Sequence, residues 1–292
     1  MRHGGWFVRI TIAVVVVLWT IPTLGVLITS FRPEDLVVST GWWTALAHPL
    51  RAAEWTFENY RTALGAAGFG NAFLNSLAVS IPSTVIPITI AAFAAYAFSW
   101  MEFRGRYVMF VAVVGLLVVP LQMALIPIVR LYAGGASLFG LQVFPDLDLN
   151  GTFLGIWLAH TGFGLPLATY LLRNYIGSLP SSIIESAKID GADHFTIFWR
   201  LIIPLSVPAL AAFAIFQFLW VWNDLLVAYV FLGGSSENQV LTIALRNLLG
   251  GRGEDWQVLT AAAFISMSLP LLVFFSLQKY FVRGLTAGAV KG

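Results

Sequence analysis

Residues 173–205 read RNYIGSLPSSIIESAKIDGADHFTIFWRLIIPL and lie between two long apolar segments. Pro180 ends the segment before it, because proline lacks a backbone N–H and clashes with the preceding turn of a helix. Ser182 followed three residues later by Glu185 has the spacing of a capping box, in which each side chain bonds to the other residue's backbone N–H. The sequence therefore predicts a new helix that begins at Ile183.

A second helix is predicted after a sharp turn in the same stretch. Gly191 follows Asp190, and glycine readily adopts the left-handed conformation that closes a helix. Asp193 can then cap the next helix with its carboxylate. Helical spacing places four apolar side chains of that helix on one face: Phe195, Phe198, Leu201 and Ile202. We therefore expect a helix, a glycine turn and another helix.

The stretch between the two apolar segments is much longer than the two to eight residues that suffice to connect helices. Ordering these additional residues costs conformational entropy, so we expect the stretch to have a further role. One interpretation is that a partner docks there, because the turn carries small residues that permit close backbone approach: Ser186, Ala187, Gly191 and Ala192. In the alternative interpretation, Glu185 only caps its helix and the small residues only pack. The residues alone favour both interpretations equally.

The composition of the whole chain is that of a membrane protein. Of its 292 residues, 59% are hydrophobic and 10% are charged, whereas soluble domains average roughly 45–50% and about 25%. The mean hydropathy is +0.84. These values exclude a soluble enzyme, a disordered segment and a nucleic-acid-binding protein. The chain has no cysteine, which excludes disulfides, thiolate nucleophiles and cysteine-ligated metals.

The apolar segments predict an all-α, polytopic membrane protein with six transmembrane helices. Each has the roughly 20 apolar residues that a bilayer crossing requires. An inner N-terminus places ten of the sixteen basic residues on the cytoplasmic side, which favours cytoplasmic N- and C-termini. Residues 173–204 then form a cytoplasmic loop and residues 279–292 a cytoplasmic tail. The predicted spans lie at about residues 10–31, 72–98, 107–129, 150–172, 205–231 and 257–278.

Motifs for catalysis or metal binding do not occur in the sequence. It contains no GxxxxGK[ST] phosphate loop, no HExxH and no GxSxG. Its four histidines are too scattered to suggest a metal site. We therefore expect no enzymatic activity, no metal and no cofactor in this chain, and no ATP hydrolysis without other subunits.

The loop also carries a family signature. It resembles the EAA sequence, EAA-x3-G-x9-I-x-LP, of permease subunits in bacterial ATP-binding-cassette (ABC) importers. The chain departs from that sequence at Ser186, Leu201 and Ile203, and each change is small or conserves volume. The similar groups keep the family spacing throughout: Glu185-Ser-Ala187, Asp190-Gly191-Ala192 and Leu201-x-Ile203-Pro204.

The resemblance covers nearly the whole chain and is strongest to carbohydrate importers of the maltose type, in particular to their smaller permease with six spans. Besides the loop, it rests on residues 120–127, 222–224 and 284–292. It implies the type I ABC importer fold. In that family the loop fits a cleft on a cytoplasmic ATPase, through Glu185, Ser186, Ala187, Asp190, Gly191, Ala192 and Pro204. The tail reaches between two ATPases, through Gly284, Leu285, Thr286, Gly288 and Lys291.

The resemblance also implies partners and a location. The chain would form one half of a heterodimeric sugar pore in a bacterial cytoplasmic membrane, with a second permease subunit. Two ATPase subunits would bind ATP and Mg, and an external binding protein would deliver an α-glucoside or malto-oligosaccharide. The alternatives are an ABC permease for another solute and a secondary transporter. A secondary transporter should show inverted repeats and more intramembrane ionisable groups than Asp224.

The fifth predicted span carries the candidate substrate path. Gln217, Trp220 and Asp224 fall at i, i+3 and i+7 with Asn223 beside them, a stripe that would line a wet cavity. Sugars are held by hydrogen bonds and aromatic faces, and this stripe offers both. Alternatively, Asp224 pairs with a neighbouring helix to fix packing. Polar groups on other spans are likewise expected to bond between helices: Gln122, His160 and Thr161.

Overall fold

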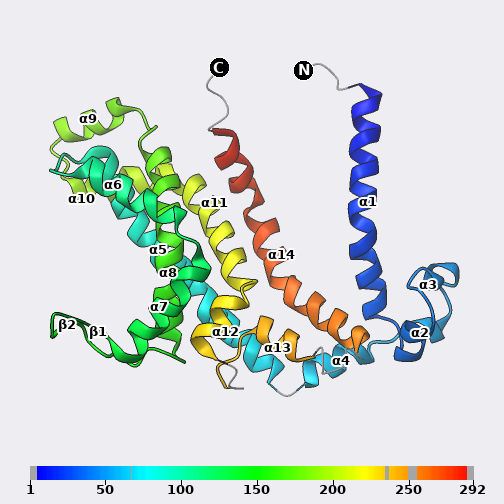
Figure 1. Ribbon diagram of the computed structural model, residues 1–292. Coiled ribbons are helices and arrows are strands. Elements are labelled where there is room, and N and C mark those ends of the chain that lie inside the picture. Colours follow the sequence, from blue (N-terminus) through cyan, green and yellow to red (C-terminus); the bar gives the residue numbers. More distant parts are fainter. Residues whose placement is uncertain (1–4, 67, 234–236, 249–254, 288–292) are drawn as a thin grey trace. The chain divides into compact units, whose positions relative to one another are not determined.

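The computed structural model describes residues 5–66, 68–233, 237–248 and 255–287, and side chains as far as residue 278. The described chain is helical apart from one antiparallel hairpin (Figure 1). In chain order, the elements are α1 (Trp6–Ser30), α2 (Glu34–Ser39), α3 (Thr44–Ala47), η1 (Ala52–Glu54), α4 (Glu58–Gly65), α5 (Phe69–Trp100), α6 (Arg106–Gly115), η2 (Leu116–Val118), α7 (Leu121–Gly134), β1 (Ala136–Leu138), β2 (Leu141–Phe144), α8 (Phe153–Ile176), α9 (Ser181–Ile189), α10 (His194–Ile197), η3 (Phe198–Ile202), α11 (Ile203–Trp222), α12 (Leu226–Leu232), α13 (Leu241–Leu248) and α14 (Trp256–Ala287).

The all-α prediction is confirmed, and several of the described helices are long and apolar enough to cross a membrane. Four qualify as continuous helices: Trp6–Ser30, Phe69–Trp100, His194–Trp222 and Trp256–Gln278. The pair α6–η2 and α7 qualifies as one segment bent by 104°. Helix α8 has 24 residues but is less apolar, since it contains His160, Thr161 and Thr169. The six-span count and the inner N-terminus remain predictions.

Two of the predicted spans are broken helices. The segment at 107–129 bends where Val119 is extended ahead of Pro120, because proline disfavours the helical conformation of the residue before it. The segment at 205–231 stops at Trp222 and restarts at Leu226. Hydropathy shows only that a stretch is apolar. It therefore could not predict either of these two breaks.

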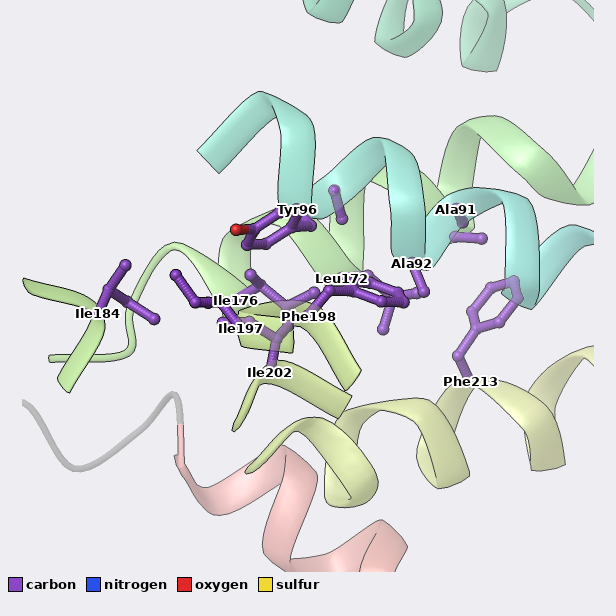
Figure 2. Packing of buried hydrophobic residues seen from close by; sticks show 12 residues of the cluster. Ala91, Ala92, Tyr96, Leu172, Ile176, Ile184, Ile197, Phe198, Ile202 and Phe213 are labelled. Carbon is purple, nitrogen blue, oxygen red and sulfur yellow. The ribbon is translucent and has the colours of Figure 1, made fainter. Parts of the chain in front are cut away.

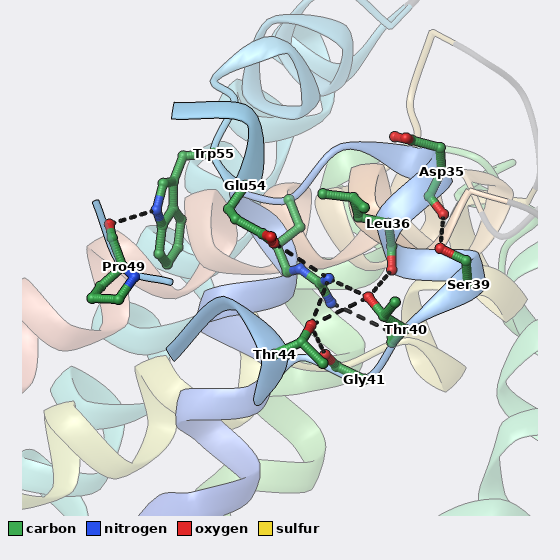
Figure 3. A network of polar contacts seen from close by, with 10 residues as sticks. Asp35, Leu36, Ser39, Thr40, Gly41, Thr44, Pro49, Glu54 and Trp55 are labelled. Atoms are coloured by element: carbon green, nitrogen blue, oxygen red, sulfur yellow. Dashed lines mark hydrogen bonds and ion pairs between the residues drawn. The ribbon is translucent and has the colours of Figure 1, made fainter. Parts of the chain in front are cut away.

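The described residues of 1–71 and 243–269 form one compact unit. Its polar centre is Arg32, whose side chain is almost fully buried. The guanidinium donates to the hydroxyls of Thr40 and Thr44 at 2.5 and 3.1 Å, and it lies 3.8 Å from the Glu54 carboxylate (Figure 3). Asn59 donates to the backbone oxygen of Arg32 at 2.8 Å. These contacts fold the segment after α1 into a compact structure.

The described residues of 72–242 and 270–292 form the second unit, in which α5, α8 and α11 pack together. Helices α8 and α11 approach closely at Gly164, where an added Cβ would lie 2.6 Å from the Gln217 side chain. Trp157 of α8 donates its indole N–H to the backbone oxygen of Ala78 in α5, at 2.9 Å. Figure 1 shows α9 and α10 at one end of α8 and the β1–β2 hairpin at the other.

Candidate functional site

The loop after α8 folds as a helix, a glycine turn and a second helix, as predicted. Gly191 adopts φ +81°, the left-handed conformation. The backbone N–H of Ala192 bonds to the oxygen of Ala187 at 2.9 Å, which closes α9. The turn is therefore built by local backbone bonds that glycine alone accepts without strain.

Asp193 caps the second helix, which confirms the sequence prediction. Its carboxylate accepts a hydrogen bond from the backbone N–H of Thr196 at 2.8 Å. Hydrogen bonds from the Thr196 side chain and backbone lower the pKa of Asp193, because they stabilise the charged carboxylate.

The predicted capping box is wrong. Helix α9 begins at Ser181, its N-cap is Pro180, and no side chain caps it. The fixed φ of proline already suits the entry to a helix, so the helix starts before Ser182 can act as its cap. Glu185 is consequently exposed and free of the capping role that the alternative interpretation gave it.

The predicted apolar face of the second helix is only partly right. Phe198 and Ile202 are buried, but Phe195 is 68% exposed. The segment η3, which follows Ile197, is π-helical, and its wider turn changes the register between the residues of α10 and those after them. As a result Ile197 is buried in place of Phe195.

A cluster of buried apolar side chains holds the loop against the helices of the second unit (Figure 2). Ile184 and Ile197 are each 1% exposed and pack with apolar side chains of α5, α8 and α11. The Tyr96 hydroxyl lies 2.8 Å from Nδ1 of His194. Trp100 donates its indole N–H to the oxygen of Ile176 at 3.1 Å. We call this arrangement, the cluster with the two polar contacts beside it, the loop platform.

The opposite side of the loop is exposed. Ile189 is 86% exposed, although it is a large apolar side chain. The small and charged residues singled out in the sequence divide between the two sides. Ala187 and Ala192 are half-buried against the loop platform, whereas the exposed residues are Glu185, Ser186, Asp190, Gly191 and Pro204.

The predicted substrate stripe does not lie on one face. Gln217 and Trp220 line a cavity of about 770 Å³ between α7, α8 and α11. Asn223 follows the end of α11 and donates to the backbone oxygen of Leu219 at 2.8 Å. Asp224 lines a different, much smaller cavity. Helical periodicity fails here because α11 ends at Trp222.

Asp224 instead caps α12 and faces α8. Its two carboxylate oxygens accept from the backbone N–H groups of Val227 at 3.3 Å and Ala228 at 2.8 Å. One of them lies 3.9 Å from Nε2 of the buried His160. These contacts are those of the structural interpretation, in which Asp224 fixes the packing of a neighbouring helix.

One wall residue of the large cavity has a buried polar atom that finds no hydrogen-bond partner within the described part of the chain. It is the Gln217 side-chain oxygen. Gln217 itself is fully buried, and its amide nitrogen donates to the Ser83 backbone oxygen at 3.2 Å. Such atoms are costly when left unbonded, so they favour a hydroxylated ligand or water in this region. We call it the Gln217 cavity.

Comparison with known proteins decides the family. Residues 87–287 match the family described as "Binding-protein-dependent transport system inner membrane component". The chain belongs to this family. It is thus a permease of an ABC transport system that depends on a binding protein, and a multi-pass membrane protein.

Two relatives resemble the permease over almost its full length. It is 57% identical to the osmoprotective compounds uptake permease protein GgtD of Synechocystis, over 97% of this chain and 91% of the relative. It is 45% identical to the alpha-glucoside transport system permease protein AglG of Rhizobium meliloti, over 98% and 97%. The sequence-based resemblance to carbohydrate permeases agrees with the second relative.

A solved structure matches the fold. A chain of a bacterial ABC transporter involved in the import of the acidic polysaccharide alginate superposes with a TM-score of 0.72 at 21% identity. The match covers 96% of the permease and 100% of that chain. The predicted fold of an ABC importer permease is therefore confirmed.

Part of the predicted site lies outside the described residues. Gly288 and Lys291 follow the last described residue, and the side chains of Gly284, Leu285 and Thr286 are also not described. Conversely, sequence reasoning missed Tyr96 and Trp100, which hold the loop from α5. Their aromatic character at the end of a predicted span was the available signal, since such residues favour membrane interfaces.

Proposed function

We propose that the permease forms one half of a heterodimeric pore in an ATP-driven importer of α-glucosides. Its partners are a second permease subunit, two cytoplasmic ATPase subunits that hold ATP and Mg, and a binding protein that delivers the sugar from outside. The membrane is the bacterial cytoplasmic membrane. The similarity to the alpha-glucoside permease of Rhizobium meliloti supports this solute class.

The two-sided loop after α8 is the observation that carries the proposal. Its outer side exposes Ile189 and the Gly191 turn, a surface on which an ATPase cleft can close. Its inner side is packed into the loop platform. Because packed interiors transmit displacement rather than absorb it, closure of the ATPases moves α5, α8 and α11 as one body.

ATP binding then drives alternating access. Closure of the ATPase dimer carries the loop inward, the attached helices rotate, and the pore opens outward to receive sugar. Hydrolysis resets the cycle. To shift the equilibrium between two conformations from 1:99 to 99:1, the coupling must supply about 5.5 kcal/mol. A loop that bent independently of its helices would dissipate that energy.

On the solute side, the Gln217 cavity offers the chemistry that a sugar needs. Trp220 provides an aromatic face, and the Gln217 oxygen, which is buried in this structure, accepts from a sugar hydroxyl when its side chain turns toward the cavity. Asp224 is not part of this solute path, because its oxygens already bond to the backbone of α12.

The similarity to the osmoprotectant permease of Synechocystis supports a second candidate solute class, small osmoprotective compounds. Both classes are tested with one reconstituted complex of permeases, ATPases and binding protein. We expect ATPase activity to rise with a labelled α-glucoside such as maltose, and vesicle uptake to be blocked by vanadate but not by a protonophore. Stimulation by a non-sugar osmoprotectant alone would replace the α-glucoside proposal, and protonophore-sensitive uptake would refute the ATP-driven one.

A further inference from the structure

Three arginines gather where α6 begins and α8 ends, and the transport cycle described above does not use them. Arg106 opens α6, Arg104 lies in the turn before it, and Arg173 lies in the last turn of α8. The end of α5 joins them, since Ser99 donates to the backbone oxygen of Arg173 at 3.3 Å. This is also the end of α8 that carries the loop. We call the three residues the arginine site.

Arg173 is held in position by aromatic rings. Its guanidinium carbon lies 4.9 Å from the centre of the Phe110 ring. The centres of the Phe110 and Phe98 rings are 5.6 Å apart. Its Nε is buried, and within the described residues it has no hydrogen-bond partner. The guanidinium is therefore oriented by stacking rather than by a hydrogen bond from Nε.

The charges of the arginine site are uncompensated. Arg106 lies one helical turn before Phe110, so it is on the same face of α6 as the stacked guanidinium. It donates to the backbone oxygen of Met101 at 3.0 Å. In the described parts of the chain, no Asp or Glu side chain lies within 4.0 Å of any of these three arginines. Fork-shaped donors without a carboxylate partner suit a phosphate group.

The surface next to the arginine site is apolar. Along α6, directly after Arg106, Tyr107 is 78% exposed, Val108 is 70% exposed and Val111 is 48% exposed. No charged residue follows on α6 or α7 until Arg130. A ligand that touches both regions needs an anionic head and an apolar body.

We propose that the arginine site binds the phosphate of an anionic phospholipid, whose acyl chains lie along the exposed face of α6. Basic groups between membrane helices bind anionic headgroups in this way. An acidic protein surface would satisfy the charges but would leave the apolar face of α6 uncovered. The proposal needs only that this end of α6 and α8 lies at a membrane surface, so it can hold even if the solute or the ATPase coupling is different.

The test uses the purified complex in nanodiscs of equal parts phosphatidylcholine and phosphatidylglycerol, with bound lipid counted by native mass spectrometry. Arg106→Gln and Arg173→Gln should each reduce retained phosphatidylglycerol about five-fold, as expected for loss of one arginine near an anionic surface. Arg104→Gln should also reduce the retained phosphatidylglycerol, and because the Arg104 side chain is exposed, this substitution should not affect folding. Arg130→Gln removes an equal charge from the opposite end and should change nothing.

Three outcomes would overturn the proposal. If all four variants retained as much phosphatidylglycerol as the parent protein, the arginines would not bind it. If Arg130→Gln lost as much as the other three variants, the contact would not be specific to the arginine site. Displacement of the lipid by inorganic phosphate at matched concentration would assign the site to a free anion. Release of the ATPase subunits by Arg106→Gln, with lipid retention unchanged, would assign it to an acidic protein partner.

Discussion

The loop platform and the Gln217 cavity belong to the same unit and share α8 and α11, yet their interiors are opposites. The loop platform is filled by apolar side chains such as Ile184, Ile197 and Ile202, each at most 1% exposed. Its polar contact, between Tyr96 and His194, is made at 2.8 Å. The Gln217 cavity leaves about 770 Å³ open, and the Gln217 oxygen in its wall has no hydrogen-bond partner among the described residues.

This difference separates two physical tasks along the same helices. A close-packed apolar interior is nearly incompressible, so it passes a displacement from the loop to the helices. Each unbonded buried polar group costs about 1–3 kcal/mol, a cost that is tolerated where a polar ligand must be bound. The predictions below test whether force transfer and solute contact are indeed divided in this way.

The largest effect is expected at the turn of the loop. Gly191→Val should abolish uptake, because a β-branched residue is strained at φ +81° and the turn would open. Uptake into vesicles and co-purification of the ATPase subunits measure the effect. Among the described residues other than Gly191 and its chain neighbours, no atom lies within 4 Å of the position where a Cβ would be added. The strain therefore comes from the backbone rather than from crowding.

Gly191→Asn is the matched control for this backbone effect. Asparagine tolerates the left-handed conformation better than other non-glycine residues, so it should retain more uptake than valine if the turn is what matters. Undiminished uptake in Gly191→Val would contradict a role of the turn in docking.

Two isoleucines of α9 test the two sides of the loop separately. Ile184→Ala should lower the free energy of unfolding by about 2–5 kcal/mol, because it opens a cavity in the loop platform. Ile189→Ala, at an 86% exposed position, should change stability by less than about 0.5 kcal/mol but weaken retention of the ATPase. Thermal unfolding and pull-down of the complex report the two effects. Equal behaviour of the two variants would remove the distinction between a packed side and a docking side.

A smaller and different effect is expected in the Gln217 cavity. Gln217→Met keeps the volume but removes the unbonded oxygen, so solute affinity should fall about ten-fold, the value of one hydrogen bond. Stability should fall as well, because the substitution also removes the amide N–H that donates to the buried Ser83 backbone oxygen at 3.2 Å. Sugar-dependent ATPase stimulation gives the half-saturating concentration, and thermal unfolding gives the stability.

Gly164→Ala provides a second way to disturb the same group. The added methyl would lie 2.6 Å from the Gln217 amide nitrogen, so the side chain must move without any change in its chemistry. We expect the affinity to fall in this variant too. A loss of stability without loss of affinity, in either variant, would mean that Gln217 only joins α8 to α11.

The sequence predicts the local parts of the loop well, because short-range rules decide them. Gly191 and Asp193 act through backbone bonds within a few residues, and both predictions are confirmed. The start of α9 is missed because two local signals compete, and Pro180 overrides the capping box. The π-helical turn at η3 is missed because it depends on how the side chains fit the loop platform.

The solute side was harder to predict because it depends on contacts between distant residues. The stripe from Gln217 to Asp224 assumes an uninterrupted helix, but α11 ends before Asp224. The hydrogen bond from Gln217 reaches Ser83, which is 134 residues earlier in the chain. Helical periodicity within one segment cannot predict a contact between residues so far apart in the chain. Only the structure could show that Gln217 and Asp224 line two different cavities.

The smallest predicted effect concerns the pH dependence of the loop. Hydrogen bonds from Thr196 lower the pKa of Asp193, so the folded loop favours the charged carboxylate. The resulting stabilisation is present above the pKa of the unfolded chain and is lost as pH falls through the lowered pKa of the folded state. Asp193→Ser keeps a cap but cannot titrate. Amide exchange at Thr196, corrected for intrinsic rates, should therefore lose protection in acid in the parent protein and not in the serine variant, whereas equal acid sensitivity in both would place the titrating group elsewhere in the loop platform.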